Sequence, residues 1–220
     1  MMATDEKLIS ATKLSIRAHA VAISKQGLWR GAKAVTMILA LATTHQLLGQ
    51  ETVVNLDPEQ TEISFTASAT LHSVHGTFKL KSGTVRFDTA TGKATGLIVV
   101  DAASGESGNR GRDRKMHKDI LESQQYPEVV FTPVRVQGQL NADRDSQVQV
   151  QGLMRLHGTE HEAAMEAQVT VTGNRLNANT HLTIPYVQWG LKNPSTFVLR
   201  VSDQVEIDVR TVGRIMPRAQ

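Results

Sequence analysis

Three polar residues in the second half of the chain have a spacing that could bind zinc. His157, Glu160 and His161 follow the order H-x-x-E-H, which one group of metallopeptidases uses with both histidines on one face of a helix. Here the string joins two segments of alternating apolar and polar residues, with Gly158 at the expected turn. A zinc site would also need a third ligand nearby. We therefore interpret the string as part of a β-hairpin, predict no metal site, and keep a histidine-based metal protein as a minor alternative.

Other residue types that often catalyse reactions form no recognisable pattern. The chain shows no Ser-His-Asp order, no framed pair of carboxylates and no phosphate-binding glycine loop. It contains no cysteine, which excludes disulfides and thiolate metal sites. His72 and His75 could sense acidic pH if they were partly buried, but their position favours exposed turn residues. We predict that the protein is not an enzyme and has no cofactor.

A cationic segment is the remaining candidate for chemistry. Residues 108–122 have helical periodicity, with Met116 and Ile120 on one face, Ser107 or Asn109 able to cap the start, and Pro127 after the end. We expect one short helix whose apolar side lies against a barrel end. Its cations could hold a phosphate or carboxylate head group, and the alternative is a solvated surface. The head-group candidates are Arg110, Arg112 and Arg114.

The elements that must position these residues are β-strands. From Glu51 onward apolar residues recur with a period of two, most regularly in Val205-Glu206-Ile207-Asp208-Val209-Arg210. Turn residues separate the alternating runs, which predicts antiparallel strands with one face toward water. About eight strands are expected, near 61–70, 75–87, 94–102, 127–133, 134–142, 147–157, 161–172 and 175–186, and a further one near 197–212. Residues 127–142 form either two of these strands or one strand bent at Pro133. Closing so many strands into an all-β barrel removes exposed edges, but a barrel of this size can be either filled or hollow.

The first 50 residues have the composition of a leader. Arg30 and Lys33 precede the apolar run 34–42, the order of charge and apolarity seen in a signal peptide. We predict cleavage at about 42–50 and a periplasmic or secreted protein. The run is shorter than the roughly 20 apolar residues of a membrane span, so no stable span is expected after cleavage. Residues 51–220 carry 18 basic and 19 acidic side chains, which removes the main electrostatic support for nucleic-acid binding.

Six sequence blocks resemble, in order, the YceI-like family. They are Leu56-Asp57-Pro58-Glu59-Gln60-Thr61-Glu62-Ile63-Ser64-Phe65, Val74-His75-Gly76-Thr77-Phe78, Ser107-Gly108-Asn109-Arg110-Gly111-Arg112-Asp113, Tyr126-Pro127-Glu128-Val129-Val130-Phe131, Gly152-Leu153-Met154-Arg155-Leu156-His157-Gly158-Thr159 and Val205-Glu206-Ile207-Asp208-Val209. The resemblance implies a lipocalin-like antiparallel barrel over residues 51–213, followed by a short tail, 214–220. It also implies an apolar tunnel that holds a polyisoprenoid or a similar amphiphile, and export to the periplasm.

Two segments depart from the family pattern where a tunnel mouth could lie. The family often has x-His-Leu after Arg-Asp, whereas Asp113 is followed by Arg114-Lys115-Met116-His117, so the helix carries one extra residue or a shifted register. The family's Asp-Phe-Gly-Leu turn is replaced by Tyr186-Val187-Gln188-Trp189-Gly190-Leu191. These changes bear on the identity of the ligand more than on the fold.

The resemblance turns the inward residues of the strands into candidates for a lipid-binding wall. The expected function is an exported, non-catalytic protein that stores or carries a long-chain lipid. The alternative is a structural or stress-related partner protein whose barrel is filled by the same side chains. The sequence does not decide whether the protein forms a homodimer. The predicted ligand-binding residues are Ile63, Phe65, Phe78, Phe87, Val100, Phe131, Leu156, Ile184 and Trp189.

Overall fold

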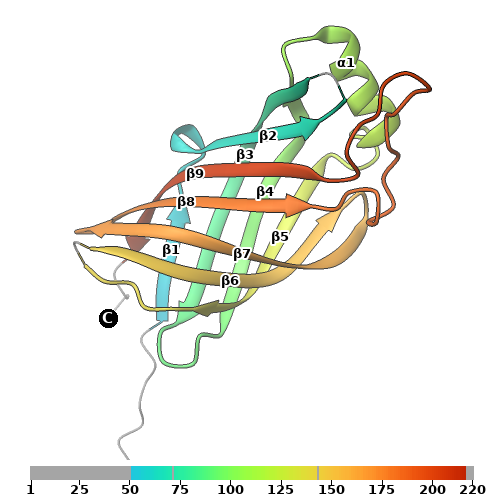
Figure 1. Cartoon of the computed structure of the whole chain (residues 1–220). Coiled ribbons are helices and arrows are strands. Elements are labelled where there is room, and N and C mark those ends of the chain that lie inside the picture. The colour runs from blue at the N-terminus through green and yellow to red at the C-terminus, as the bar shows by residue number, and fades with distance from the viewer. Residues whose placement is uncertain (1–50, 71, 143, 217–220) are drawn as a thin grey trace, which may run out of the picture. The chain divides into compact units, whose positions relative to one another are not determined.

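A computed structural model describes residues 51–70, 72–142 and 144–216 (Figure 1). The predicted leader, residues 1–50, lies outside the described residues, as do the last four residues of the predicted tail. Within the part of the chain that is described, no helix is both long and apolar enough to span a membrane.

The described residues form nine antiparallel strands, one α-helix, one 3-10 turn and one π-helical turn. The strands are β1 (Glu51–Leu56), β2 (Glu62–Ser68), β3 (Ser73–Asp88), β4 (Ala94–Glu106), β5 (Glu128–Gln137), β6 (Asp145–Leu156), β7 (Thr159–Thr172), β8 (Arg175–Ile184) and β9 (Val205–Met216). The helical elements are η1 (Pro58–Gln60), α1 (Arg110–Lys115) and η2 (Met116–Ile120).

The strands close into a barrel with eight strand positions. β2 to β9 pair in a ring that β3 and β4 complete. β1 pairs with the same two neighbours as β2, namely β3 and β9, but further along them. The two strands therefore share one position, interrupted where Asp57 caps the η1 turn through a hydrogen bond from the Glu59 backbone N–H (3.0 Å). The predicted eight-stranded, all-β antiparallel barrel with one short helix is confirmed.

The structure settles one alternative that the sequence left open and moves several expected strand boundaries. Residues 128–137 form one strand, whose pairing with β6 shifts by one residue between Pro133 and Arg135. Proline has no N–H to donate to the ladder, so the strand bulges there instead of ending. β1 was not expected, and β9 continues to Met216, beyond the predicted barrel boundary at 213.

The helical segment joins β4 to β5 at one end of the barrel (Figure 1). Asn109 caps α1 by accepting hydrogen bonds from the backbone N–H groups of Gly111 (3.0 Å) and Arg112 (3.1 Å). The π-helical turn follows, closed by the Leu121 N–H donating to the Met116 carbonyl (2.8 Å). A π-turn lets a helix hold one additional residue. Such a turn can hold an extra residue after Asp113, which is one of the two alternatives that the sequence leaves open; the other is a shifted register.

The barrel interior divides into two halves. The half farther from α1, which we call the filled half, is closed by a cluster of small and medium apolar side chains: Val54, Phe87, Ala94, Val136, Val148, Ala167, Val169, Val171, Leu176 and Ala178. The half beneath α1 and the segment 185–204, which we call the hollow half, contains a second cluster built around Phe131, Met154, Leu156, Ile184, Tyr186 and Leu191.

Candidate functional site

An apolar cavity of about 300 Å³ occupies the hollow half of the barrel. Every strand contributes inward side chains to its wall, because alternate residues of each strand face the interior. The wall consists of Leu56, Ile63, Phe65, Ala67, Phe78, Leu80, Ile98, Val100, Val129, Phe131, Met154, Leu156, Met165, Leu182, Ile184, Val205, Ile207 and Val209, with Thr61, Thr180 and Thr211. This volume lies at the low end of the range for small-molecule sites, roughly 300–1,000 Å³.

The end of the cavity is covered by two segments that are not strands. Met116, Ile120 and Leu121 reach it from the helical segment, which confirms that the apolar side of the helix lies against a barrel end. The other cover consists of residues from the segment 185–204, namely Tyr186, Leu191, Pro194 and Val201. Tyr186 and Leu191 belong to the segment that the sequence placed at a possible tunnel mouth, whereas Pro194 and Val201 were not expected, because the rest of the segment has no regular period.

Three of the polar side chains that border the cavity, Thr61, Thr211 and Tyr186, form hydrogen bonds within the protein. Thr61 and Thr211 hydroxyl oxygens lie 2.7 Å apart in a hydrogen bond, and the Thr61 oxygen also lies 2.7 Å from the Asp57 carbonyl. The Tyr186 hydroxyl donates to the Ser202 carbonyl (2.7 Å), and burial raises the pKa of Tyr186 to about 12. The phenol is therefore neutral at ordinary pH. Among the described residues, the side chains that border the cavity carry no charge. Such a wall suits an alkyl chain rather than a polar metabolite.

The structure brings seven of the nine predicted ligand-binding residues to this wall: Ile63, Phe65, Phe78, Val100, Phe131, Leu156 and Ile184. Phe87 also faces inward, but it lies near the β3–β4 turn and belongs to the cluster of the filled half. Trp189 packs against the apolar cluster of the hollow half without lining the cavity.

Trp189 covers a gap in strand pairing. β7 and β8 pair only as far as Glu166 and His181, so the first part of β7 has no partner strand on that side. The Trp189 ring stacks on the His161 ring there, with centroids 4.4 Å apart and planes 2° from parallel. The aromatic pair therefore covers part of the β7 segment that has no partner strand.

The three candidate head-group residues do not converge on the cavity. Arg112 donates from Nε to the Ser107 hydroxyl (2.7 Å) and from Nη2 to the Ser107 carbonyl (2.8 Å). Asp113 accepts hydrogen bonds from the backbone N–H (2.9 Å) and the hydroxyl of the same serine. Arg112 and Asp113 thus fasten the start of α1 to the end of β4. Arg110 and Arg114 are exposed to solvent.

The two histidines of the H-x-x-E-H string have different surroundings. His157 Nε2 lies 3.2 Å from a Glu122 carboxylate oxygen, and its ring contacts Tyr126. His161 stacks on Trp189, and its buried Nε2 has no hydrogen-bond partner. The string is confirmed as the β6–β7 hairpin. In the described part of the chain, no three His, Cys, Asp or Glu side chains are grouped so that they could hold a metal ion.

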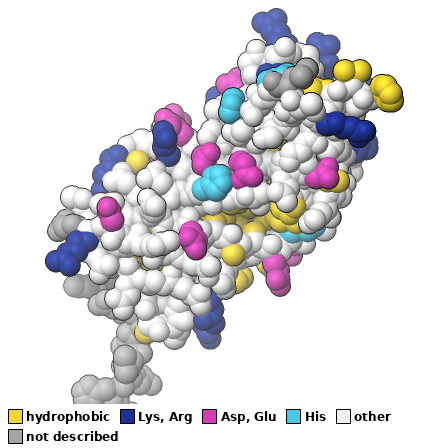
Figure 2. All heavy atoms as spheres, in the orientation of Figure 1, with side chains coloured by type: hydrophobic (Ala, Val, Ile, Leu, Met, Phe, Trp, Pro, Cys, Tyr) yellow, Lys and Arg dark blue, Asp and Glu magenta, His cyan; other side chains and the backbone are white. Residues whose placement is uncertain are grey.

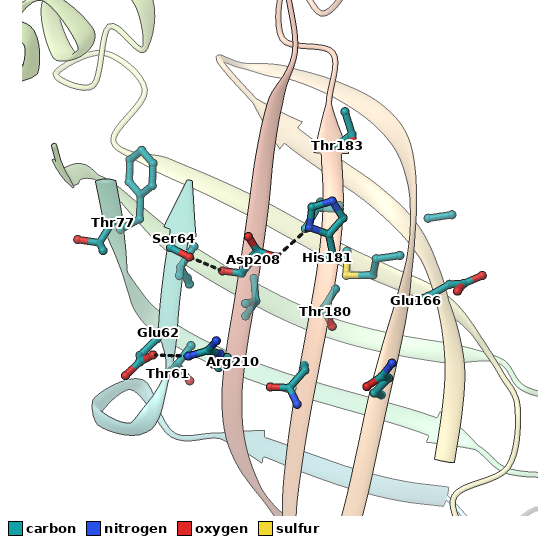
Figure 3. A pocket seen from close by; sticks show the side chains of 18 of the residues that line it. Thr61, Glu62, Ser64, Thr77, Glu166, Thr180, His181, Thr183, Asp208 and Arg210 are labelled. Atoms are coloured by element: carbon teal, nitrogen blue, oxygen red, sulfur yellow. Dashed lines mark hydrogen bonds and ion pairs between the residues drawn. The ribbon is translucent and has the colours of Figure 1, made fainter. Parts of the chain in front are cut away.

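A larger and more polar hollow, about 1220 Å³, runs along β2, β3, β7, β8 and β9 (Figure 3). It is open to solvent, and exposed side chains such as Glu62, Asp208 and Arg210 border it. His181 lies between two carboxylates, 2.8 Å from Asp208 and 3.0 Å from Glu206. The hydrogen bond with Asp208 is the main reason that the pKa of His181 is raised.

This polar hollow lacks the hydrogen-bond chain of a serine hydrolase. Ser64 points toward β9, but its hydroxyl donates to the Asp208 backbone carbonyl (3.4 Å) and not to His181 (Figure 3). A nucleophilic serine needs its base within hydrogen-bond reach. The larger hollow therefore gives less basis for a functional assignment than the smaller apolar cavity.

The fold and the cavity together define a class of protein. A closed antiparallel barrel of about eight strands with an apolar interior is the architecture of lipocalin-like small-molecule-binding barrels. Residues 55–212 match the sequence family described as the YceI-like domain, and the chain belongs to that family.

Relatives of similar length have modest sequence identity. A UPF0312 protein of Pseudomonas savastanoi pv. phaseolicola (strain 1448A / Race 6) is 27% identical over 191 residues, covering 82% of this chain and 94% of its own. A UPF0312 protein of Pseudomonas putida (strain W619) is 26% identical over the same length, with the same coverage of both chains.

Solved structures share the fold. BcnA of Burkholderia cenocepacia superposes with a TM-score of 0.58 at 18% identity, covering 71% of this chain and 98% of its own. A polyisoprenoid binding domain from Saccharophagus degradans, implicated in plant cell wall breakdown, gives 0.56 at 18% identity, with 74% and 98% covered. The Campylobacter jejuni YCEI protein gives 0.53 at 17% identity, with 68% and 88% covered.

Proposed function

We propose that this protein is a non-catalytic binding protein that holds a polyisoprenoid or another long-chain amphiphile in the hollow half of its barrel. The observation that carries the proposal is the cavity wall, to which all strands contribute apolar side chains and no charged one. The polyisoprenoid binding domain from Saccharophagus degradans supports this choice of ligand, since the two barrels share a fold.

The energetics favour a flexible apolar chain. Each CH₂-sized group that leaves water for such a wall contributes about 0.8 kcal/mol. Ordering the chain and losing its free motion offset part of this gain. Because the site has no charged groups, it selects a ligand mainly by apolar contact. The length and branching of the chain therefore decide the affinity.

The cavity can adapt to chains of different shape. Met116, Met154 and Met165 border it from three different elements. Methionine side chains are unbranched and flexible, so they fill irregular gaps and move at low cost. We therefore expect bound chains to enlarge the cavity beyond roughly 300 Å³.

We also propose that the protein is exported to the periplasm or beyond. The support is the order of Arg30 and Lys33 before the apolar run 34–42. Mass determination of the mature protein tests this point, with cleavage expected at about 42–50 and an intact N-terminus contradicting it.

Mass spectrometry under native conditions tests the binding function. The protein, purified without detergent from a bacterial host, is expected to carry one long-chain lipid that is released on denaturation. Val100→Trp places a bulky ring in the cavity and is expected to lower lipid occupancy at least about tenfold. Leu97→Trp, on the outer face of the same strand, is the matched control, because Leu97 is 52% exposed.

Two results would count against the proposal. One is a folded protein that carries no lipid and binds none when polyprenols or fatty acids are added. The other is equal lipid occupancy in Val100→Trp and Leu97→Trp, which would place the ligand outside the cavity.

A further inference from the structure

A tight turn in the segment 185–204 presents two apolar side chains to solvent. The Thr196 N–H donates to the Leu199 carbonyl (2.8 Å), and the Leu199 N–H donates to the Thr196 hydroxyl (3.1 Å). Between them Phe197 is 100% exposed and Val198 is 82% exposed. These are the two most exposed large apolar side chains of the described residues. Neither contributes to the barrel core.

The base of this turn is fixed to the barrel. The Thr70 N–H donates to the Arg200 carbonyl (2.9 Å), and Val201 forms a β-bridge with Ala69. On the other side, the Asn193 side-chain amide donates to the Val201 carbonyl (3.1 Å). A segment held in this way projects its tip in a defined direction. The inner residues of the same segment cover the cavity.

The two segments that cover this end of the barrel are also cationic. Residues 107–122 and 185–204 contain seven Lys or Arg against four Asp or Glu, a net charge of +3. The rest of residues 51–220 contain eleven against fifteen, a net charge of −4. In Figure 2, Lys and Arg side chains stand on both sides of the hydrophobic side chains that project at this end. The exposed cations are Arg110, Arg114, Lys115, Lys118, Lys192 and Arg200.

Three of the four acidic residues in these two segments already have partners. Asp113 is bonded to Ser107, and Asp203 accepts from the Asn193 amide (2.6 Å). Glu122 lies 3.2 Å from His157 and 3.4 Å from Lys192. Arg110, Arg114, Lys115 and Lys118 form no ion pair among the described residues, so their charge faces the solvent.

We propose that this end of the barrel, formed by Phe197, Val198 and the exposed cations of α1 and its flanks, docks on an anionic phospholipid bilayer. Apolar side chains inserted at the interface and basic residues beside lipid phosphates are the two contributions that hold a peripheral protein on a membrane. The inference goes beyond the proposed function, because docking depends on surface residues and not on the content of the cavity.

The size of the apolar patch favours a bilayer over a protein partner or a second copy of the chain. A stable protein–protein interface buries about 1,200–2,000 Å² with a packed apolar centre. Two side chains at the tip of a turn provide far less than this. A bilayer interface accepts single inserted side chains, and the surrounding cations add about 1 kcal/mol each near an anionic surface, or roughly fivefold in binding.

A single-site fluorescent label tests the insertion. The chain has no cysteine, so Phe197→Cys gives one position for an environment-sensitive dye on the otherwise unchanged full chain. With vesicles of phosphatidylglycerol and phosphatidylcholine we expect the emission to rise and shift to the blue, with a smaller change on pure phosphatidylcholine. Leu97→Cys, an exposed apolar position on β4, is the matched control and should not respond.

Vesicle co-sedimentation then separates the two contributions. Because residues 34–42 are themselves apolar, all variants are compared with the same N-terminus. Phe197→Ser with Val198→Ser should lower the bound fraction on anionic vesicles about tenfold or more. Arg114→Glu with Lys118→Glu should lower it by a similar factor and remove its dependence on salt. Arg86→Glu, on β3, is the charge control.

Three outcomes would overturn the docking surface. The first is a dye at 197 that responds no more than the dye at 97. The second is unchanged vesicle binding in the serine or glutamate variants. The third is loss of self-association, rather than of vesicle binding, in the serine variant. Lipid content after extraction is measured in parallel, so a docking failure in a lipid-loaded protein leaves the proposed function intact.

Discussion

The two halves of the barrel interior share the same strands but differ in how they are filled. Both halves have apolar side chains at alternate positions. In the filled half these are mostly Val and Ala, and they meet across the barrel. In the hollow half they include Phe, Leu, Ile and Met, yet a space remains between them. Because these larger side chains do not meet across the barrel, opposite strands must lie farther apart in the hollow half.

Strand pairing explains why the hollow half is wider. β7 and β8 are paired in the filled half and separate beyond Glu166 and His181. The shared position of β1 and β2 is likewise interrupted at residues 57–60, next to the cavity residue Thr61. The end of the hollow half is covered by the helical segment and by residues 185–204, and not by strands. The closure of the wall, and not the apolarity of its residues, therefore determines where a ligand can fit.

The largest expected contrast between the halves is in stability. Phe87→Ala removes a buried ring from the filled half, and we expect a loss of about 3–5 kcal/mol in the free energy of unfolding. Phe78→Ala removes a ring that already borders space, so its loss should be less than half as large. Urea unfolding of lipid-free protein measures both values. Equal losses would contradict the division into a filled and a hollow half.

Removal of the aromatic pair should loosen the wall of the hollow half. Trp189→Ala uncovers the part of β7 that lacks a partner strand, so we expect bound lipid to exchange about tenfold faster, equivalent to about 1.4 kcal/mol in the barrier. Transfer of a fluorescent fatty acid to acceptor vesicles measures the rate. Gln188→Ala, at an exposed neighbouring position, is the control. An unchanged rate would show that exchange occurs through the helix end alone.

Detachment of the helical cover should have a smaller and local effect. Arg112→Ala loses the hydrogen bonds to Ser107 that join α1 to β4, and a hydrogen bond of a charged group contributes about 1.5–3 kcal/mol. We expect faster amide hydrogen exchange in residues 110–121 and little change in the filled half. Arg114→Ala, which removes an exposed side chain, should change stability by less than about 0.5 kcal/mol. Identical exchange in both variants would refute the fastening role.

The smallest expected effect is a pH dependence of the free energy of unfolding. It arises from His181, which lies on the outer face of the hollow half. The neighbouring carboxylates raise its folded-state pKa above the ordinary value of 6.5. The stabilising contribution is therefore complete below pH 6.5 and is lost as the pH rises through the folded pKa. Because the side chain is 60% exposed, we expect less than about 1 kcal/mol.

A titration of the His181 ring by NMR measures this pKa. Asp208→Asn should lower it toward 6.5. The difference in unfolding free energy between the parent and His181→Gln should shrink between pH 6 and pH 9. A difference that grows over this range would contradict the assignment.

The sequence predicted the wall of the cavity but not its extent along the barrel. Alternation identifies inward residues, and it placed Ile63 and Phe131 correctly on the wall. It cannot separate Phe65 from Phe87, because both face inward and only their distance from the barrel ends differs. That distance depends on the register between strands that are far apart in the chain.

Residues outside regular elements were the hardest to predict. Pro194 and Val201 follow no period, so nothing local indicates that they cover a cavity. Trp189 was expected on the tunnel wall, and its stacking on His161 depends on where β8 leaves β7. The helix and its cap were predictable from local signals. The role of Arg112 in fixing that helix was open because its partner, Ser107, is positioned by the end of β4.

The most direct test of the hollow half is a measurement of which methyl groups contact a bound chain. With methyl-labelled protein and a bound polyprenol, we expect nuclear Overhauser effects from the ligand to Ile63, Leu182 and Ile184. Binding in the hollow half predicts no such effect to Val169 or Leu176 in the filled half. Contacts distributed over both halves, or absent from the hollow half, would contradict it.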